Sequence, residues 1–214
     1  DGSSRFADGY KWGNFPSASV AWRISEEGFW DGARRIVDNF KLRASYGKLG
    51  NNNVDRYATH EVYSSGNYPF GGKISGGLVP GGFVNKRLTW EETDMLDIGL
   101  DISFLRRFSL IVDFYDKNTR KILTQSVIPF NNGTSSGPLV NGPQVRNRGV
   151  EFELAYAGRV AKDLNLFVKV NGGFNQNKVI RYQGADKMIQ GGGTPFGYIV
   201  EGYPIGQFYI MQVD

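Results

Sequence analysis

Hydrophobic and polar residues alternate with a period of two along much of this chain. The alternation is clearest in residues 96–104, where apolar side chains at even positions alternate with polar or small residues at odd positions. Successive side chains of a β-strand point to opposite faces, so this segment is predicted to be a strand with one apolar and one charged surface. The same pattern predicts strands at 20–24, 40–46, 108–115, 150–156 and 164–171, and a weaker seventh from about Tyr198 to Ile210, broken near Gly202-Tyr203-Pro204.

The links between these strands alternate in length. A very short turn around Arg106-Arg107, about seven residues between 156 and 164, and a moderate link from 24 to 40 join strands in pairs. Between the pairs lie long links rich in Gly, Asn, Ser and Tyr, at roughly 50–90, 118–147 and 175–197. Short turns on one rim and long loops on the other are typical of outer-membrane β-barrels. A wall of antiparallel transmembrane strands, with short periplasmic turns and long extracellular loops, is therefore predicted.

The amino-acid composition excludes several classes of protein. With 40% hydrophobic and 21% charged residues, the chain is too apolar for a disordered protein and too polar for a helical membrane protein. No stretch approaches the roughly 20 apolar residues of a spanning helix. The absence of cysteine excludes disulfides and thiolate metal sites. The charges are interspersed without a Lys/Arg run, so no nucleic-acid partner is expected.

The charged faces of the predicted strands fit a barrel lumen. Strands survive in hydrocarbon only in a closed barrel, whose inner side chains meet water or a plug. The residues expected to face the lumen are Arg23, Lys41, Arg43, Asp97, Asp101, Asp113, Glu151, Glu153 and Lys169. Aromatic residues near strand ends fit interfacial girdles; they are Trp12, Trp22, Tyr46, Trp90, Tyr115 and Tyr156.

Two alternatives remain open on the pattern alone. A soluble antiparallel sheet also alternates, so a β-sandwich carbohydrate-binding domain is one alternative. A surface glycan-binding protein that transports nothing is the other. The chain is also expected to be a fragment, because seven is an odd number of strands and residues 211–214 lack a terminal aromatic.

Several runs resemble SusC/RagA-type TonB-linked outer-membrane proteins. In chain order they are DGSSRF at 1–6, FPS at 15–17, AWRISEE at 21–27, KLRASYG at 41–47 with Gly50-Asn51, LTWE at 88–91, DIGLD at 97–101, DFYDKNT at 113–119, RNRGVE at 146–151 and EGYPIG at 201–206. Together they cover essentially the whole chain.

The resemblance implies a 22-stranded barrel with an N-terminal plug, in the outer membrane of a Gram-negative bacterium. Such a protein imports glycans or peptides, driven by the TonB complex and served by a SusD-like surface lipoprotein. Residues 1–214 would form part of that barrel, with the plug, the TonB-contacting segment and the remaining strands outside this chain. Outer-membrane lipid, the lipoprotein, TonB and a glycan or peptide substrate are the expected partners.

Candidate chemistry is sparse. His60 is the single histidine and stands in a polar loop without a nucleophile or second ligand nearby in sequence, so no catalytic residue, cofactor or metal site is expected. The carboxylate pairs Asp97/Asp101 and Glu151/Glu153 are interpreted as lumen wall. Ring faces and amides in the long loops suit sugar or peptide binding. The candidates are Tyr57, Tyr63, Tyr68, Phe70, Phe83, Asn131 and Asn132, with Asn51, Asn52 and Asn53 beside them.

Overall fold

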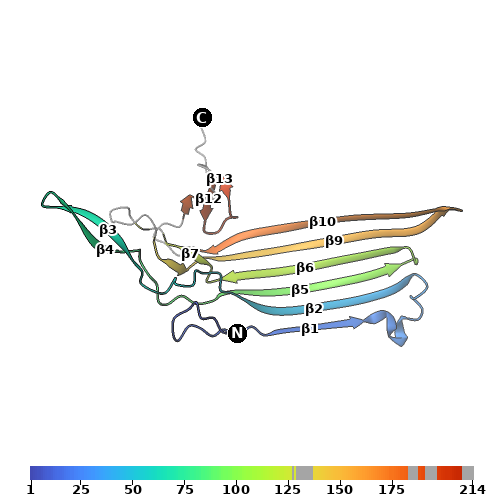
Figure 1. Ribbon diagram of the computed structural model, residues 1–214. Helices are drawn as coiled ribbons and strands as arrows, with labels where there is room; N and C mark the ends of the chain where they lie inside the picture. The colour runs from blue at the N-terminus through green and yellow to red at the C-terminus, as the bar shows by residue number, and fades with distance from the viewer. Residues whose placement is uncertain (127, 129–136, 183–187, 191–196, 209–214) are drawn as a thin grey trace.

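The computed structural model describes residues 1–214 except 127, 129–136, 183–187, 191–196 and 209–214. Its main element is a six-stranded antiparallel sheet in which every strand pairs with its neighbours in chain order (Figure 1). We call this sheet the wall. Its strands are β1 (Ser17–Arg23), β2 (Val37–Asn51), β5 (Glu91–Phe104), β6 (Phe108–Arg120), β9 (Gln144–Ala161) and β10 (Leu164–Arg181). Among the described residues, no helix has the length and apolar character needed to cross a membrane.

The connections are sorted to the two ends of the wall. At one end, the turn end, β1 joins β2 through two short 3-10 helices, η1 (Ile24–Glu26) and η2 (Gly28–Trp30). There also, residues 105–107 join β5 to β6, and residues 162–163 join β9 to β10. The long connections all leave from the opposite end, the loop end (Figure 1). The predicted sorting of short turns and long loops is therefore confirmed.

The turn between β5 and β6 depends on an unusual backbone. Leu105 and Arg106 both have positive φ, 53° and 55°, and they are the central residues of a turn in which the Arg107 N–H donates to the Phe104 carbonyl at 3.3 Å. The conformation disfavours non-glycine residues. It is held by the Arg106 N–H, which donates to Asp38 Oδ2 at 2.7 Å, and by the Leu105 N–H, which donates to the Ile36 carbonyl at 2.8 Å.

The strands extend further toward the loop end than the hydrophobic pattern predicts. β10 runs 18 residues, well past residue 171. β9 also continues to Ala161 at the turn end, so two residues, Lys162 and Asp163, replace the expected link of seven. Beyond the apolar stretch both faces become polar, and polarity alternation no longer reports a strand. Cross-strand hydrogen bonds and ion pairs maintain the register there.

Three small sheets lie in the long connections. β3 (Tyr63–Phe70) and β4 (Lys73–Pro80) form a hairpin, and β7 (Leu123–Gln125) pairs with β8 (Leu139–Asn141). The third sheet contains β11 (Met188–Gln190), β12 (Gly197–Val200) and β13 (Gln207–Phe208). The seventh wall strand expected from Tyr198 onward is therefore wrong for the described residues. Gly202 and Gly206, with φ of 93° and 79°, turn the chain between β12 and β13.

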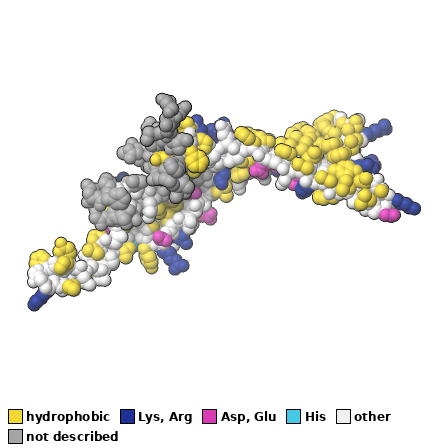
Figure 2. Space-filling view, turned by 90° about the horizontal axis from the view of Figure 1, so that it is seen from above, with side chains coloured by type: hydrophobic (Ala, Val, Ile, Leu, Met, Phe, Trp, Pro, Cys, Tyr) yellow, Lys and Arg dark blue, Asp and Glu magenta, His cyan; other side chains and the backbone are white. Residues whose placement is uncertain are grey.

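The register gives the wall two different faces. From β1 to β10, even-numbered residues pair with even-numbered residues and odd with odd, apart from irregular pairs near Val37, Leu164 and Val179. The even face carries the apolar side chains over the turn-end part of the wall, and many are about half exposed, for example Ile98 at 46% and Val168 at 45%. Figure 2 shows hydrophobic side chains gathered over this part. None of the described strands packs face to face on the wall, so the sandwich alternative is not what the structure shows.

The buried core is small and lies at the loop end. Phe6, Val54, Leu88 and Trp90 form it, at 0–8% exposure. The N-terminal segment closes this cluster: the Arg5 Nη1 donates to the Val54 carbonyl at 2.8 Å, and the Trp90 Nε1 donates to the Lys11 carbonyl at 3.0 Å. The cluster holds the two ends of the long link between β2 and β5 together at the loop end of the wall.

Candidate functional surfaces

The odd face of the wall carries the charged residues that the sequence singles out. All nine have odd numbers, and the register places them on this one surface. Lys41 faces Asp101, and Asp113 faces Glu151 as cross-strand partners. Assignment of this face to a barrel lumen stays a prediction, whereas the shared surface is a finding.

Arg43 is the centre of an ion-pair network on the odd face. Its Nε and Nη2 bind the Asp101 carboxylate at 3.1 and 2.9 Å, and the same Nη2 lies 2.8 Å from Asp113 Oδ1. Lys41 Nζ adds a contact to Asp101 at 3.5 Å. The side chains of Arg43, Asp101 and Asp113 are 23–31% exposed, so the network is half-buried against the sheet. It ties together β2, β5 and β6.

Gly99 provides the space for this network. It lies between Arg43 and Asp113 in register, on the strand that separates them. A Cβ at Gly99 would be 2.4 Å from Asp113 Oδ1 and 2.6 Å from Arg43 Cζ. A glycine inside a strand marks a close approach of another group, and here that group is the guanidinium crossing β5.

A second crossing of the same kind lies nearby. Tyr115 on β6 crosses Gly149 on β9, and its hydroxyl donates to Asn175 Oδ1 on β10 at 3.1 Å. A Cβ at Gly149 would be 2.4 Å from the Tyr115 hydroxyl. Tyr115 therefore belongs to the odd face, and its expected place in an aromatic girdle is wrong.

The remaining charges of the odd face are less connected. Lys169 Nζ lies 2.7 Å from Glu153 Oε1. Within the described residues, Asp97, Glu151 and Arg23 make no ion pair, and no group of three or more His, Asp or Glu side chains is placed to hold a metal ion. The carboxylate pairs Asp97/Asp101 and Glu151/Glu153 are thus spread along the wall and do not gather at one site.

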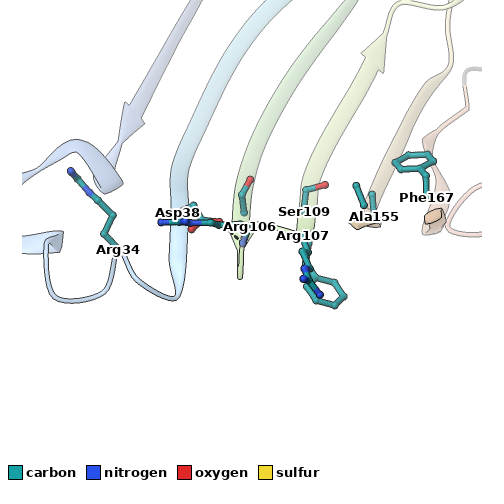
Figure 3. Close-up of a pocket in the computed structure, with 10 residues that line it drawn as sticks. Arg34, Asp38, Arg106, Arg107, Ser109, Ala155 and Phe167 are labelled. Atoms are coloured by element: carbon teal, nitrogen blue, oxygen red, sulfur yellow. Dashed lines mark hydrogen bonds between the residues drawn. The ribbon is translucent and has the colours of Figure 1, made fainter. Parts of the chain in front are cut away.

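A hollow of about 570 Å³ opens at the turn end of the wall. Figure 3 shows side chains from the turns and the adjoining strands around it, including Arg34, Asp38, Arg106, Arg107 and Phe167. Arg34 is engaged with the backbone, because its Nη2 donates to the Ser25 carbonyl at 2.6 Å. The Asp38 carboxylate is used by the Arg106 amide. Arg34 and Asp38 therefore hold the turns in place.

The even face changes character toward the loop end. From Phe104 to Leu96 it is apolar, a span of eight residues or about 27 Å along the strand at ~3.4 Å per residue. Membrane barrels carry an apolar band roughly 25 Å tall. Level with Leu96 and beyond it, the same face carries charges that we call the collar. Its members are Lys48, Glu92, Asp94, Asp116, Arg120, Arg146, Arg148 and Lys178, together with Lys121, which follows β6 and binds Glu92.

Ion pairs connect most of the collar. Glu92 binds Lys48 at 2.6 Å and Lys121 at 2.5 Å. Asp94 binds Arg120, and Asp116 binds both Arg146 and Arg148, the latter at 3.2 Å. The sequence pattern of apolar alternation gave no sign of this collar, because its residues appear simply polar on both faces.

The strand-end aromatics divide between different environments. Trp22 and Tyr46 lie on the even face, each 49% exposed. Tyr156 lies on the same face at the turn end, its ring 5.0 Å from that of Phe108. Trp90 is 8% exposed within the loop-end core, so its expected place in a girdle is also wrong.

The candidate loop residues do not converge on one enclosed site. Tyr68 and Phe70, 71% and 75% exposed, share one face of the β3–β4 hairpin, whereas Tyr63 lies on the other. Tyr57 and Phe83 are 70% and 53% exposed in the flanking links. Asn131 and Asn132 lie outside the described residues.

The other polar loop candidates have structural partners. Asn52 Nδ2 donates to Ser3 Oγ at 2.9 Å, Asn51 Nδ2 donates to Glu91 Oε1 at 3.2 Å, and Asn51 Oδ1 accepts from the Asn53 N–H at 3.0 Å. These three asparagines shape the root of the first long loop. His60 lies against Thr59 and the Tyr57 ring.

Comparisons with known proteins agree on this architecture. Residues 1–204 match the model of the family described as TonB dependent receptor-like, beta-barrel. The chain is 37% identical over 187 residues to TonB-dependent receptor P26 of Formosa agariphila, covering 87% of this chain and 19% of that protein. It is 31% identical to TonB-dependent receptor SusC of Bacteroides thetaiotaomicron, covering 99% of this chain and 22% of that protein.

Solved structures show the same fold. The RagAB peptide importer in its closed-closed state matches with a TM-score of 0.85 at 23% identity, over 95% of this chain and 22% of that one. The chain thus spans about a fifth of the length of these relatives.

Proposed function

Because this chain belongs to the TonB-dependent receptor-like β-barrel family, we propose that it forms part of the barrel of an outer-membrane importer for large nutrients, oligosaccharides or peptides. The importer works with a SusD-like surface lipoprotein and draws its energy from the TonB complex. Residues 1–214 contribute a section of the wall, and the plug and the TonB-contacting segment belong to the rest of a longer protein. The section itself catalyses no reaction.

One observation carries this proposal: the wall exposes a continuous apolar face and an opposite charged face. Exposed apolar patches of this extent are rare on soluble monomers. The apolar face matches hydrocarbon and the charged face matches water. This requires that the edges of the sheet close into a barrel, so that the backbone hydrogen bonds of the edge strands are satisfied. The apolar even face is thus assigned to lipid and the charged odd face to the lumen.

The placement of the long loops supports the assignment of the loop end to the outside of the cell. Long loops leave from one end only, and in outer-membrane barrels that end is extracellular. The exposed rings of Tyr68 and Phe70 on the β3–β4 hairpin lie there. They offer flat apolar faces to a sugar ring or to a peptide side chain. The structural neighbour RagAB is a peptide importer, which supports a large nutrient as the class of substrate.

The test uses the full-length receptor in its own cell. We expect deletion of the gene to abolish uptake of one class of labelled oligosaccharide or peptide, and restoration to require an intact TonB system. A control strain lacking the SusD-like partner is expected to lose uptake at low substrate concentration. Unchanged uptake of every compound after deletion, or uptake that continues without TonB, would contradict the proposal.

A further inference from the structure

The collar has more positive than negative charge, and the excess is concentrated around Asp116. In the described residues the collar holds six basic side chains and three carboxylates. Arg146 and Arg148 both bind the single carboxylate of Asp116, and a third base, Lys178, lies opposite Arg146 on β10. The other two carboxylates, Glu92 and Asp94, are already engaged by Lys48, Lys121 and Arg120.

The arrangement of these three bases leaves one of them without an anion. Lys178 is the cross-strand partner of Arg146, and like charges directly opposite one another destabilise a sheet. Arg146 is committed to Asp116 by a two-pronged contact of its Nε and Nη2. Lys178 is exposed and makes no ion pair with any described residue. Arg148, 48% exposed, shares the carboxylate that Arg146 already holds.

The position of the cluster defines what kind of anion would reach it. Arg148 lies two residues beyond Val150, and Val150 pairs with Phe114 and Phe174 in the last row of the apolar band. These three side chains are 41%, 41% and 73% exposed. A molecule lying on this face therefore contacts the apolar side chains of this row. One to two rows further toward the loop end, it contacts a cluster of cations.

We propose that Arg146, Arg148 and Lys178 form a binding site for the phosphate of a lipid headgroup in the leaflet at the loop end of the barrel. Guanidinium and ammonium groups bind phosphate by charge-assisted hydrogen bonds, and the acyl chains of the same lipid lie on Phe114, Val150 and Phe174. Arg148 and Lys178 make the main contacts, and Arg146 keeps its bond to Asp116. The site rests on the outer-membrane placement of the wall but not on transport or on any substrate.

The site is tested by titrating the full-length receptor with bisphosphorylated lipid A and with the same lipid after dephosphorylation, read by native mass spectrometry. A basic residue near an anionic membrane surface contributes about a fivefold factor in affinity. The double variant Arg148→Gln/Lys178→Gln is expected to bind phosphorylated lipid A roughly 25-fold more weakly, and the dephosphorylated lipid equally well.

Lys117→Gln is the matched control. Lys117 lies next to Asp116 at the same height of the wall, is exposed, and makes no ion pair with a described residue, but it is on the odd face. We expect this variant to bind both lipids like the unaltered receptor. Equal binding of phosphorylated lipid A by the double variant and the unaltered receptor would overturn the site. So would an equal loss in Lys117→Gln, or complete displacement of the lipid by inorganic phosphate. Because uptake is not measured, failure of the importer proposal would leave this result unaffected.

Discussion

Arg43 Nη2 lies 2.8 Å from Asp113 Oδ1, although β2 and β6 are not neighbours in the wall. The contact crosses β5 at Gly99, the one position in register between the two residues. An ordinary cross-strand pair joins adjacent strands, whereas this one joins three. Tyr115, Gly149 and Asn175 repeat the arrangement on β6, β9 and β10. On the odd face, side chains that cross glycine positions therefore connect three strands at a time.

Substitution of Gly99 tests the first crossing. Gly99→Ala is expected to destabilise the full-length receptor by about 1–3 kcal/mol, the usual cost of overpacking, because the new Cβ overlaps the guanidinium and the Asp113 carboxylate. The measurement is thermal unfolding followed by the electrophoretic mobility of the barrel. Gly47→Ala is the control, since its Cβ would lie 3.6 Å from the nearest atom, Ser17 Cβ. Equal shifts in both variants would show that Gly99 has no special role.

Removal of the guanidinium tests the network itself. Arg43→Gln is expected to cost about 1–3 kcal/mol, since hydrogen bonds to charged groups contribute on this scale. The half-buried Asp113 loses its ion pair, and Asp101 keeps only the contact from Lys41 at 3.5 Å. Arg43→Lys restores the charge but not the forked geometry, so it should recover only part of the loss. A double-mutant cycle with Asp113→Asn measures the direct coupling. A coupling near zero would mean that the two side chains do not interact in solution.

A charge on the even face tests the lipid assignment through stability. Leu154 lies in the middle of the apolar band and is 40% exposed. Leu154→Arg is expected to cost about 2–4 kcal/mol in a membrane, as for arginine at the midplane of a barrel. Asn171→Arg places the same side chain at the same height on the odd face, beside Glu153, and should be tolerated. The readout is the free energy of unfolding from lipid vesicles; similar values for both variants would argue against a lipid-facing even face.

Truncation of a loop ring tests substrate contact. Tyr68 is 71% exposed on the β3–β4 hairpin, so Tyr68→Ala should leave the barrel intact while raising the Kd for the substrate at least about threefold, a modest share of a typical contact energy. Tyr63→Ala, on the other face of the hairpin, is the comparison. Unchanged affinity and uptake in the Tyr68 variant would remove this residue from the substrate surface.

The two faces of the wall could be predicted from the sequence, whereas its connections across strands could not. Alternation reports directly which side of a strand a residue occupies, so local information is enough to place Ile98 and Asp97 on opposite faces. The Arg43–Asp113 contact depends on register between distant segments, for which the only local sign was a glycine inside a strand. Trp90 shows a different limit, because an aromatic residue at a strand end looks the same in sequence whether it meets lipid or closes a loop-end core.

For a related reason, the hydrophobic pattern does not predict the full length of the strands or the path of the chain after Tyr198. Past Leu96 and Phe114 the even face carries ions, and polar residues on both faces resemble a loop. From Tyr198 onward, alternation resumes briefly, but glycines with positive φ at 202 and 206 divert the chain into a separate small sheet. The candidate rings could be assigned to the long loops, but not to the two opposite faces of the hairpin on which they lie.

The most direct test of the central claim is the environment of residues on the two faces of one strand. Residues 1–214 include no cysteine, so single cysteines at positions 96, 97, 98, 100, 101 and 103 of a full-length receptor, with any cysteine outside these residues replaced, can each carry a spin label in lipid vesicles. Oxygen, which concentrates in hydrocarbon, is expected to relax labels at 96, 98 and 100, and a water-soluble nickel chelate those at 97, 101 and 103. If all six positions respond alike, or if the even positions respond to the chelate, the wall does not separate lipid from water.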